Sequence, residues 1–289
     1  MNASRTGPQV GPVVVGVDES GEARRAALWA SDEAARRRRP LHLVHGSDVE
    51  GRILDLPAEA AERLREAGRA LLERTAGEVR DRHPALSVST ELSGAGPAMS
   101  LRRAAADGAT IVVGDHTPGG FGHLVGSPAG LGAAVQARTP VIVVKGDGAG
   151  PDKGVVLAAV RDGRDLDCAR HAAQAAELRR ASLRLLHVRS RLQRPAGPVG
   201  EQRGPGLADV AEQIRDEYPS LTVIADVDQG VSVAGVLAEA SRHADLLVMG
   251  GRRAVGRAPG HAVHSLVRHA HCPVELVPQR GDQHRSEAS

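Results

Sequence analysis

The residues best suited to chemistry lie in one stretch, residues 111–127, with the sequence IVVGDHTPGGFGHLVGS. A short apolar run stops at Gly114, and a glycine-rich loop then leads through Gly126 to Ser127 and an alanine-rich segment. A strand, a glycine loop and a helix in this order direct backbone N–H groups and the positive end of a helix at a phosphate. The chain contains no Gly-Lys-Ser/Thr, and the loop lacks the dinucleotide GxGxxG spacing. The pattern therefore predicts phosphate or nucleotide binding by a loop of another kind.

A second group with chemical potential lies near the end of the chain, at His261, His264, His269, His271 and Cys272. His261 and His264 are one helical turn apart, so they could present two imidazoles to a metal ion. No second cysteine lies nearby to complete a tetrahedral set, and histidines also suit the negative end of a helix. We therefore favour a structural role for this group. No nucleophile, base and orienting residue fall into a recognisable order, so no catalytic residue is predicted.

The elements that must position the glycine loop alternate between strands and helices. In the first half we expect strands at residues 10–17, 41–44, 86–91, 111–113 and 141–144. Helices are expected on the alanine-spaced segment after Gly21 and at residues 57–82, 97–106 and 128–137. This alternation predicts a parallel, doubly wound sheet.

The chain repeats itself once. Three segments recur in the same order, namely residues 41–45 and 183–187, 83–88 and 218–223, and 140–144 and 273–277. The period is a whole domain, which is too long for a solenoid. We therefore predict two tandem doubly wound domains of the α/β class, each with a five-stranded parallel sheet, at residues 10–146 and 153–278.

Composition narrows the possible functions. Of the 289 residues, 41% are hydrophobic and 25% charged but only 1% aromatic, so the cores must consist of Val, Leu, Ile and Ala, as in buried parallel sheets. No aromatic residues interleave with basic ones, and the run Arg36 to Arg39 suits a helix end, so nucleic-acid binding is not expected. Two cysteines are too few for a disulfide framework. The first residues lack the apolar core of a signal peptide, and no apolar run approaches membrane length, so we expect a cytoplasmic protein with no membrane partner.

The glycine loop resembles that of the universal stress protein family. ATP-binding members carry Gly, two residues, Gly, nine residues and then Gly-Ser/Thr, and Gly114, Gly126 and Ser127 match three of these four places. Thr117 stands where the second Gly belongs, and the second gap is one residue shorter. The strand segments VVVGVDES, LVHG and TPVIVV also match the family, and the resemblance extends over both copies.

The resemblance implies an adenine nucleotide site, for ATP or AMP with Mg as a further candidate, in the first copy. In the family the acid at the position of Asp18 contacts adenosine, the backbone at Val44 meets the adenine edge, and the glycine loop with Ser127 holds ribose and phosphates. The family's sheet order places the first and fourth strands side by side, so Asp18 and Gly114 would flank one crevice. The site residues expected on this basis are Val17, Asp18, Val44, Val113, Gly114, His116, Gly119, Gly126 and Ser127. Asp18 also has a structural alternative as a helix cap.

The second copy departs further from the family pattern. Arg161 occupies the position of Asp18, Arg253 that of the second Gly, and His261 that of Ser/Thr. We therefore expect a degenerate second site and one nucleotide per chain.

Two classes of function follow from these observations. The first is a nucleotide-binding module in stress response or signalling, and the alternative is an interaction scaffold that has kept the fold and lost the ligand. Slow ATP hydrolysis is a third, for which no dedicated base is found. Family members commonly dimerise through their fifth strands, so we expect residues 141–144 and 274–277 to pair in an intramolecular pseudo-dimer. A further homodimer of this pseudo-dimer is an additional candidate assembly.

Overall fold

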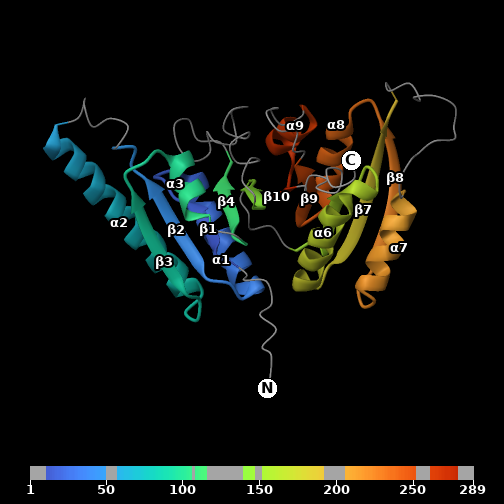
Figure 1. Cartoon of the computed structure of the whole chain (residues 1–289), viewed down its shortest axis with the longest axis horizontal. Coiled ribbons are helices and arrows are strands. Elements are labelled where there is room, and N and C mark those ends of the chain that lie inside the picture. The colour runs from blue at the N-terminus through green and yellow to red at the C-terminus, as the bar shows by residue number, and fades with distance from the viewer. Residues whose placement is uncertain are drawn as a thin grey trace, which may run out of the picture. The chain divides into compact units, whose positions relative to one another are not determined.

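The computed structural model describes residues 11–49, 57–105, 108–115, 139–146, 152–191, 206–251 and 261–278. The chain forms two compact units, Met1–Val144 and Lys145–Ser289, each of which combines a sheet with helices (Figure 1). No helix among the described residues has the length and apolar character needed to cross a membrane. The two units are considered one at a time.

The first unit is built on a parallel sheet in the order β3-β2-β1-β4-β5. Its strands are β1 (Val13–Gly16), β2 (Leu41–Gly46), β3 (Val88–Ser93), β4 (Thr110–Gly114) and β5 (Val141–Val144). β1 pairs with β2 on one side and with β4 on the other, so Val15 lies opposite both Leu43 and Val112. This is the doubly wound arrangement that the sequence predicts, with the first and fourth strands adjacent.

Three described helices pack on this sheet: α1 (Gly21–Arg37), α2 (Ala58–Arg82) and α3 (Pro97–Ala104). The small side chains of α1, Ala23, Ala26, Ala27, Ala30 and Ala34, are all buried, so this helix can approach the valine-rich strands closely. Leu71, Leu72, Ala76 and Val79 of α2 join the same core. The helix expected at residues 128–137 lies outside the described residues.

The second unit repeats this plan in the order β10-β9-β6-β7-β8. Its strands are β6 (Val155–Ala159), β7 (Ser182–Ser190), β8 (Val223–Gly230), β9 (Leu246–Gly251) and β10 (Val274–Pro278). Its helices are α6 (Leu166–Arg179), α7 (Leu207–Glu217), α8 (Val233–Ala240) and α9 (His261–His269), with short 3-10 turns at Gly163–Asp165 and Ser241–His243. Two tandem α/β domains with five-stranded parallel sheets are thus confirmed.

Two strands, β1 and β3, start later than expected. β1 is shorter than predicted, since it starts at Val13 after Pro12, a residue with no N–H to donate to a ladder. β3 starts at Val88 because the Leu86 N–H donates to the His83 carbonyl at 3.0 Å, which closes a turn before the strand.

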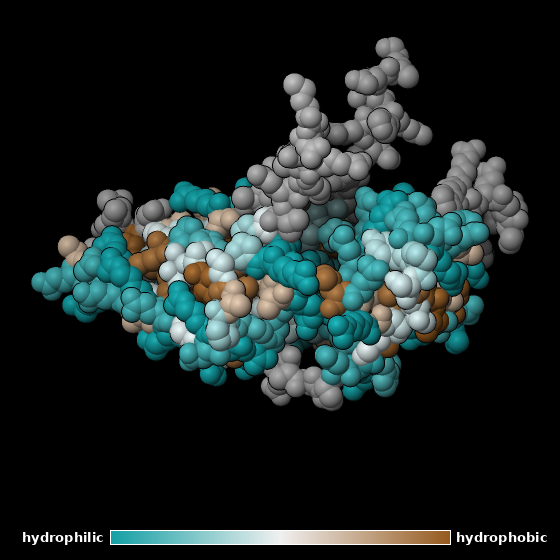
Figure 2. Space-filling view, turned by 90° about the horizontal axis from the view of Figure 1, so that it is seen from below, coloured by the Kyte–Doolittle hydropathy of each residue, from teal (hydrophilic) through white to brown (hydrophobic). Residues whose placement is uncertain are grey.

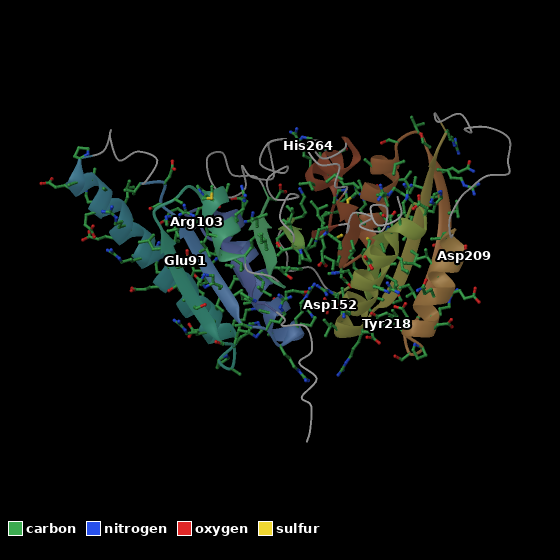
Figure 3. All side chains as sticks on the ribbon, viewed as in Figure 1. Glu91, Arg103, Asp152, Asp209, Tyr218 and His264 are labelled. Carbon is green, nitrogen blue, oxygen red and sulfur yellow. The ribbon has the colours of Figure 1, made fainter. Side chains whose placement is uncertain are left out.

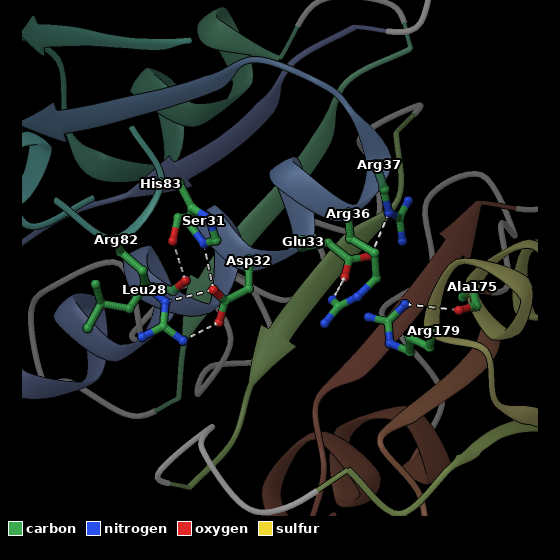
Figure 4. A network of polar contacts seen from close by, with 10 residues as sticks. All are labelled: Leu28, Ser31, Asp32, Glu33, Arg36, Arg37, Arg82, His83, Ala175 and Arg179. Carbon is green, nitrogen blue, oxygen red and sulfur yellow. Dashed lines mark hydrogen bonds and ion pairs between the residues drawn. The ribbon is translucent and has the colours of Figure 1, made fainter. Parts of the chain in front are cut away.

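The arginine run is used structurally. Arg36 and Arg37 both pair with the buried Glu33, at 2.9 and 2.5 Å, and Figure 4 shows this contact at the end of α1. Arg38 has a φ of 52° and closes the helix in the left-handed conformation. Arg39 is buried and donates to the Pro12 carbonyl at 3.1 Å and the Thr110 hydroxyl at 3.0 Å. The run therefore ends α1, and its last residue, Arg39, links the segment before β1 to the start of β4.

Candidate functional site

The sheet brings part of the expected site together. Asp18 follows β1, Val44 lies near the end of β2, and Gly114 ends β4, so all three lie at the carboxyl ends of neighbouring strands. Val17 and Val113 belong to the same edge. Ligands of doubly wound sheets bind at this edge, where the strand order reverses. His116, Gly119, Gly126 and Ser127 lie outside the described residues.

Asp18 holds the start of α1. Its Oδ1 accepts a hydrogen bond from the Ser20 N–H at 2.9 Å and another from the Ser20 hydroxyl. The Ser20 Oγ in turn accepts from the Ala23 N–H at 3.1 Å and so caps the helix. Asp18 therefore acts as the orienting partner of an N-cap, and it is half-buried beside the end of β4.

Gly114 is required by packing. A Cβ on this residue would lie 2.7 Å from the carbonyl oxygen of Glu22 and 3.1 Å from the N atom of Ala23, both in the first turn of α1. Gly114 is not among the described glycines with positive φ, so close approach of two backbones, and not an unusual turn, excludes a side chain here. The first turn of α1 thus rests directly on the end of β4.

His45 is a residue of this edge that our sequence reasoning did not assign. Val17 donates its N–H to the Val44 carbonyl at 2.8 Å, and the His45 Nδ1 lies 2.8 Å from the Val17 carbonyl oxygen. A carbonyl can only accept, so Nδ1 carries the proton of this hydrogen bond. Gly68 of α2 makes room for the ring, because a Cβ there would lie 2.8 Å from His45 Cδ2.

The second unit repeats this contact. The Val160 N–H donates to the Leu186 carbonyl at 3.0 Å, and the His187 Nδ1 lies 3.0 Å from the Val160 carbonyl oxygen. His45 and His187 end the repeated segments LHLVH and LRLLH, and this shared last histidine is the signal by which sequence analysis could have found them. Since Val160 matches Val17, Arg161 is placed at the position of Asp18.

Arg161 gives the second edge a different chemistry. Its Nη2 and Nε contact the two carboxylate oxygens of Asp165 at 2.6 and 2.9 Å, and Asp165 is only 1% exposed. Hydrogen bonding to Asp165 raises the pKa of Arg161 above its ordinary value. Next to it, hydrogen bonds from Arg164 lower the pKa of Asp162 to about 2. A cation held by its own buried acid therefore replaces the carboxylate of the first unit.

The remaining expectations for the second copy fall mostly outside the described residues. Arg253 is outside the described residues. The backbone of His261 begins α9, but its side chain is not described. Within the part of the chain that the structure describes, no three His, Cys, Asp or Glu side chains are placed to hold a metal ion. Cys272 is buried, and its burial raises the pKa of the thiol to about 12, so it is a core residue.

Comparison with known proteins identifies this architecture. A model described as the universal stress protein family matches residues 10–145 and 155–278. A universal stress protein of Mycobacterium tuberculosis is 30% identical over 294 residues, which cover 97% of this chain and 99% of the relative. The chain belongs to the universal stress protein family.

This chain aligns with only about half the length of several other relatives. Universal stress proteins of Mycobacterium bovis and Mycobacterium tuberculosis are 39% identical over 141 residues, which cover 48% of this chain and 46% of each relative. The crystal structure of a universal stress protein from Archaeoglobus fulgidus has a TM-score of 0.70 at 14% identity and covers 95% of this chain and 98% of that one, so the fold is shared. A universal stress protein crystallised in complex with cAMP matches 44% of this chain and 97% of its own, with a TM-score of 0.34 and 19% identity.

Proposed function

We propose that this universal stress protein binds one adenine nucleotide, ATP or AMP, at the carboxyl edge of the first unit. The observation that carries the proposal is the contrast between the two edges. In the first unit the carboxylate of Asp18 follows β1 beside the end of β4. In the second unit Arg161 follows β6 beside the end of β9, and Asp165 neutralises its charge. A carboxylate accepts hydrogen bonds from ribose hydroxyls, and a guanidinium cannot.

The proposed roles follow from chemistry at each position. Asp18 accepts from the ribose, and the Val44 carbonyl, which has a second lone pair beyond its bond to Val17, accepts from the adenine amino group. From the sequence motif we propose that the backbone N–H groups of Gly126 and Ser127, with His116 and Gly119 of the same segment, bind phosphate. Mg, if it accompanies ATP, would neutralise part of the phosphate charge. We place this module in a cytoplasmic stress or signalling response.

The alternative is an interaction scaffold without a ligand. It is favoured by the bonds of Asp18 to Ser20, which give this carboxylate a structural reason to be present. Binding of labelled nucleotide separates the two. The proposal predicts saturable binding of ATP or AMP by the full chain, and the scaffold predicts none.

A Gly126→Val variant tests the role of the loop. A β-branched side chain at this position should block the approach of phosphate and weaken nucleotide binding by about 2–4 kcal/mol, while the folded state is retained. Fluorescence titration with labelled ATP, AMP and cyclic AMP measures the effect, and circular dichroism checks the fold. Unchanged affinity in a folded variant would make the loop purely structural.

For the molecule as a whole we propose domains at residues 10–146 and 153–278, with the fifth strand of each, residues 141–144 and 274–277, paired in an intramolecular pseudo-dimer. The support is that β5 ends the strand order of the first unit and β10 that of the second, so each unit taken alone has an open strand edge there. Pairing of the two edges would protect both from association with other chains.

A further inference from the structure

The two units differ at the strand that ends each sheet on the side opposite the fifth strand, β3 in the first unit and β8 in the second. Register identifies equivalent positions, since His42 lies opposite Ser89 and its counterpart Arg184 lies opposite Ile224. Ser89 of the first unit therefore corresponds to Ile224, and Leu92 corresponds to Val227. Two polar side chains of β3 are satisfied locally, since His42 Nδ1 lies 2.8 Å from the Ser89 Oγ and Nε2 lies 3.1 Å from Glu91. Figure 3 labels Glu91 on this strand.

β8 exposes apolar side chains where β3 does not. Ile224 is 46% exposed, Val227 48% and Val231, just beyond the strand, 66%. Leu92 packs into the core beneath α2, which has 25 residues, whereas α7 has 11 and leaves Val227 uncovered. Figure 2 shows hydrophobic surface on the right of the view, the side on which β8 lies in Figure 1.

The backbone of β8 is directed outward at alternate residues. Its ladder with β7 begins with the Leu183 N–H donating to the Thr222 carbonyl and ends with the Arg191 N–H donating to the Gly230 carbonyl, at 2.9 Å each. Even-numbered residues therefore face β7, and the odd-numbered ones point their N–H and C=O groups away from it. Arg215 donates to the Val223 carbonyl at 3.0 Å and covers the start of this edge. Ala225, Val227 and Gln229 present the remaining groups.

The charges of β8 indicate what can pair with it. Asp226 and Asp228 lie on the same face as Ile224, with side chains 40% and 49% exposed, and share one guanidinium, that of Arg184, at 2.8 and 3.7 Å. This face therefore keeps a net negative charge. Suppose that β8 of a second copy paired antiparallel with this β8. In the registers with the most overlap, Asp226 would lie opposite Asp226 or Asp228 of the other copy. Like charges directly opposite each other destabilise a sheet, so a second copy is disfavoured.

We propose that β8 is a docking edge for an extended basic peptide, which adds as a sixth strand to the sheet of the second unit. The peptide's main chain bonds to Ala225, Val227 and Gln229, two of its lysine or arginine side chains spaced two residues apart face Asp226 and Asp228, and an apolar side chain covers Ile224. Addition of a strand at an open edge obtains affinity from the backbone and selectivity from alternate side chains. This surface is separate from the nucleotide edge and does not depend on it.

The test uses the full chain and a labelled synthetic peptide, acetyl-Thr-Val-Thr-Lys-Thr-Lys-Thr-amide, with a control peptide in which Glu replaces both Lys residues. We expect saturable binding of the Lys peptide that weakens as salt rises and is at least about tenfold weaker for the Glu peptide. Ala225→Pro removes an outward N–H without breaking the ladder to β7, and should lower affinity at least about tenfold. The matched variant Thr90→Pro makes the same change on β3 and should leave affinity unchanged.

Other results would overturn the proposal. They are absence of saturable binding, equal affinity for the Glu peptide, or equal affinity of Ala225→Pro in a protein with unaltered circular dichroism. Should Ala225→Pro fail to fold, Asp228→Lys reverses one charge on the exposed face and should also lower affinity at least about tenfold, with no change if the proposal is wrong. Self-association of the chain that Ala225→Pro abolishes, without peptide binding, would assign the edge to a second copy instead.

Discussion

At the scale of single residues, Gly114 illustrates how one sequence feature can have a cause that the sequence does not reveal. The sequence motif indicates a phosphate loop at Gly114, and that role stays a proposal. The structure adds an independent requirement, because the first turn of α1 lies against it. Contact between segments far apart in the chain leaves no local pattern, so this reason could not be predicted. The capping alternative expected for Asp18 is met only in part, because Ser20 is the N-cap of α1 and Asp18 orients it by accepting from the Ser20 N–H.

Gly114→Ala should destabilise the protein by about 1–3 kcal/mol, since the new Cβ meets backbone atoms that cannot move cheaply. Gly77→Ala is the matched control. A Cβ at Gly77 in α2 meets nothing within 4 Å, and this change should stabilise by about 0.5–1 kcal/mol through helix propensity. Urea unfolding measures both. A similarly small change in the free energy of unfolding for both variants would show that α1 shifts to accommodate a Cβ at residue 114.

At the scale of elements, polar contacts fix helices to one another in both units. In the first unit, Asp32 of α1 contacts Arg82 at 2.7 and 2.8 Å and lies 2.7 Å from the His83 Nε2, at the end of α2 (Figure 4). In the second, Arg170 of α6 pairs with Glu217 of α7 at 2.6 Å. The same helix pair is therefore tied twice, with different residues in each copy.

The Asp32 contacts predict a pH dependence of stability. Burial opposes ionisation of Asp32, but hydrogen bonds from Arg82 and His83 outweigh it and lower the pKa below the ordinary 3.8. The stabilisation is therefore fully present above the unfolded pKa of about 4 and is lost as the pH falls through the lower folded value. Asp32→Asn should cost about 1 kcal/mol at pH 7 and progressively less below about pH 4. Denaturant unfolding at both pH values tests this, and a constant cost across the range would contradict it.

Most elements could be predicted because their patterns are local. β5 has the expected limits, Val141–Val144, since turn residues bound this apolar pattern. α8 was not predicted, because eight residues of mostly small apolar side chains do not distinguish a helix from a buried strand. The exposure of Val227 could not be predicted either, since it depends on which helix covers the strand.

At the scale of the whole molecule, the chain is a duplication whose copies have diverged at their edges while the sheets have stayed alike. The same histidine contact recurs at His45 and His187, yet Asp18 is matched by Arg161 and Ser89 by Ile224. This divergence at the edges of like sheets agrees with our two proposals, which give the copies separate binding roles on a common scaffold.

The proposed pseudo-dimer makes the stability of the units interdependent. Val143→Glu should place a charge in the shared strand pair and lower the melting temperature of both units together, because an unpaired buried charge is costly. Val143→Ile is the control and should change the melting temperature little. Differential scanning calorimetry records one or two transitions. A shift of one transition alone would show that the units are independent.

Titration calorimetry of the full chain decides whether only the first unit binds nucleotide. We expect one molecule of ATP or AMP per chain. Asp18→Asn, which keeps the acceptor oxygen for Ser20 but loses the charge, should weaken binding by roughly tenfold or more. The matched change Asp162→Asn in the second unit should leave affinity and stoichiometry unchanged. Two molecules per chain, or binding that Asp162→Asn weakens and Asp18→Asn does not, would show that the nucleotide site is not confined to the first unit.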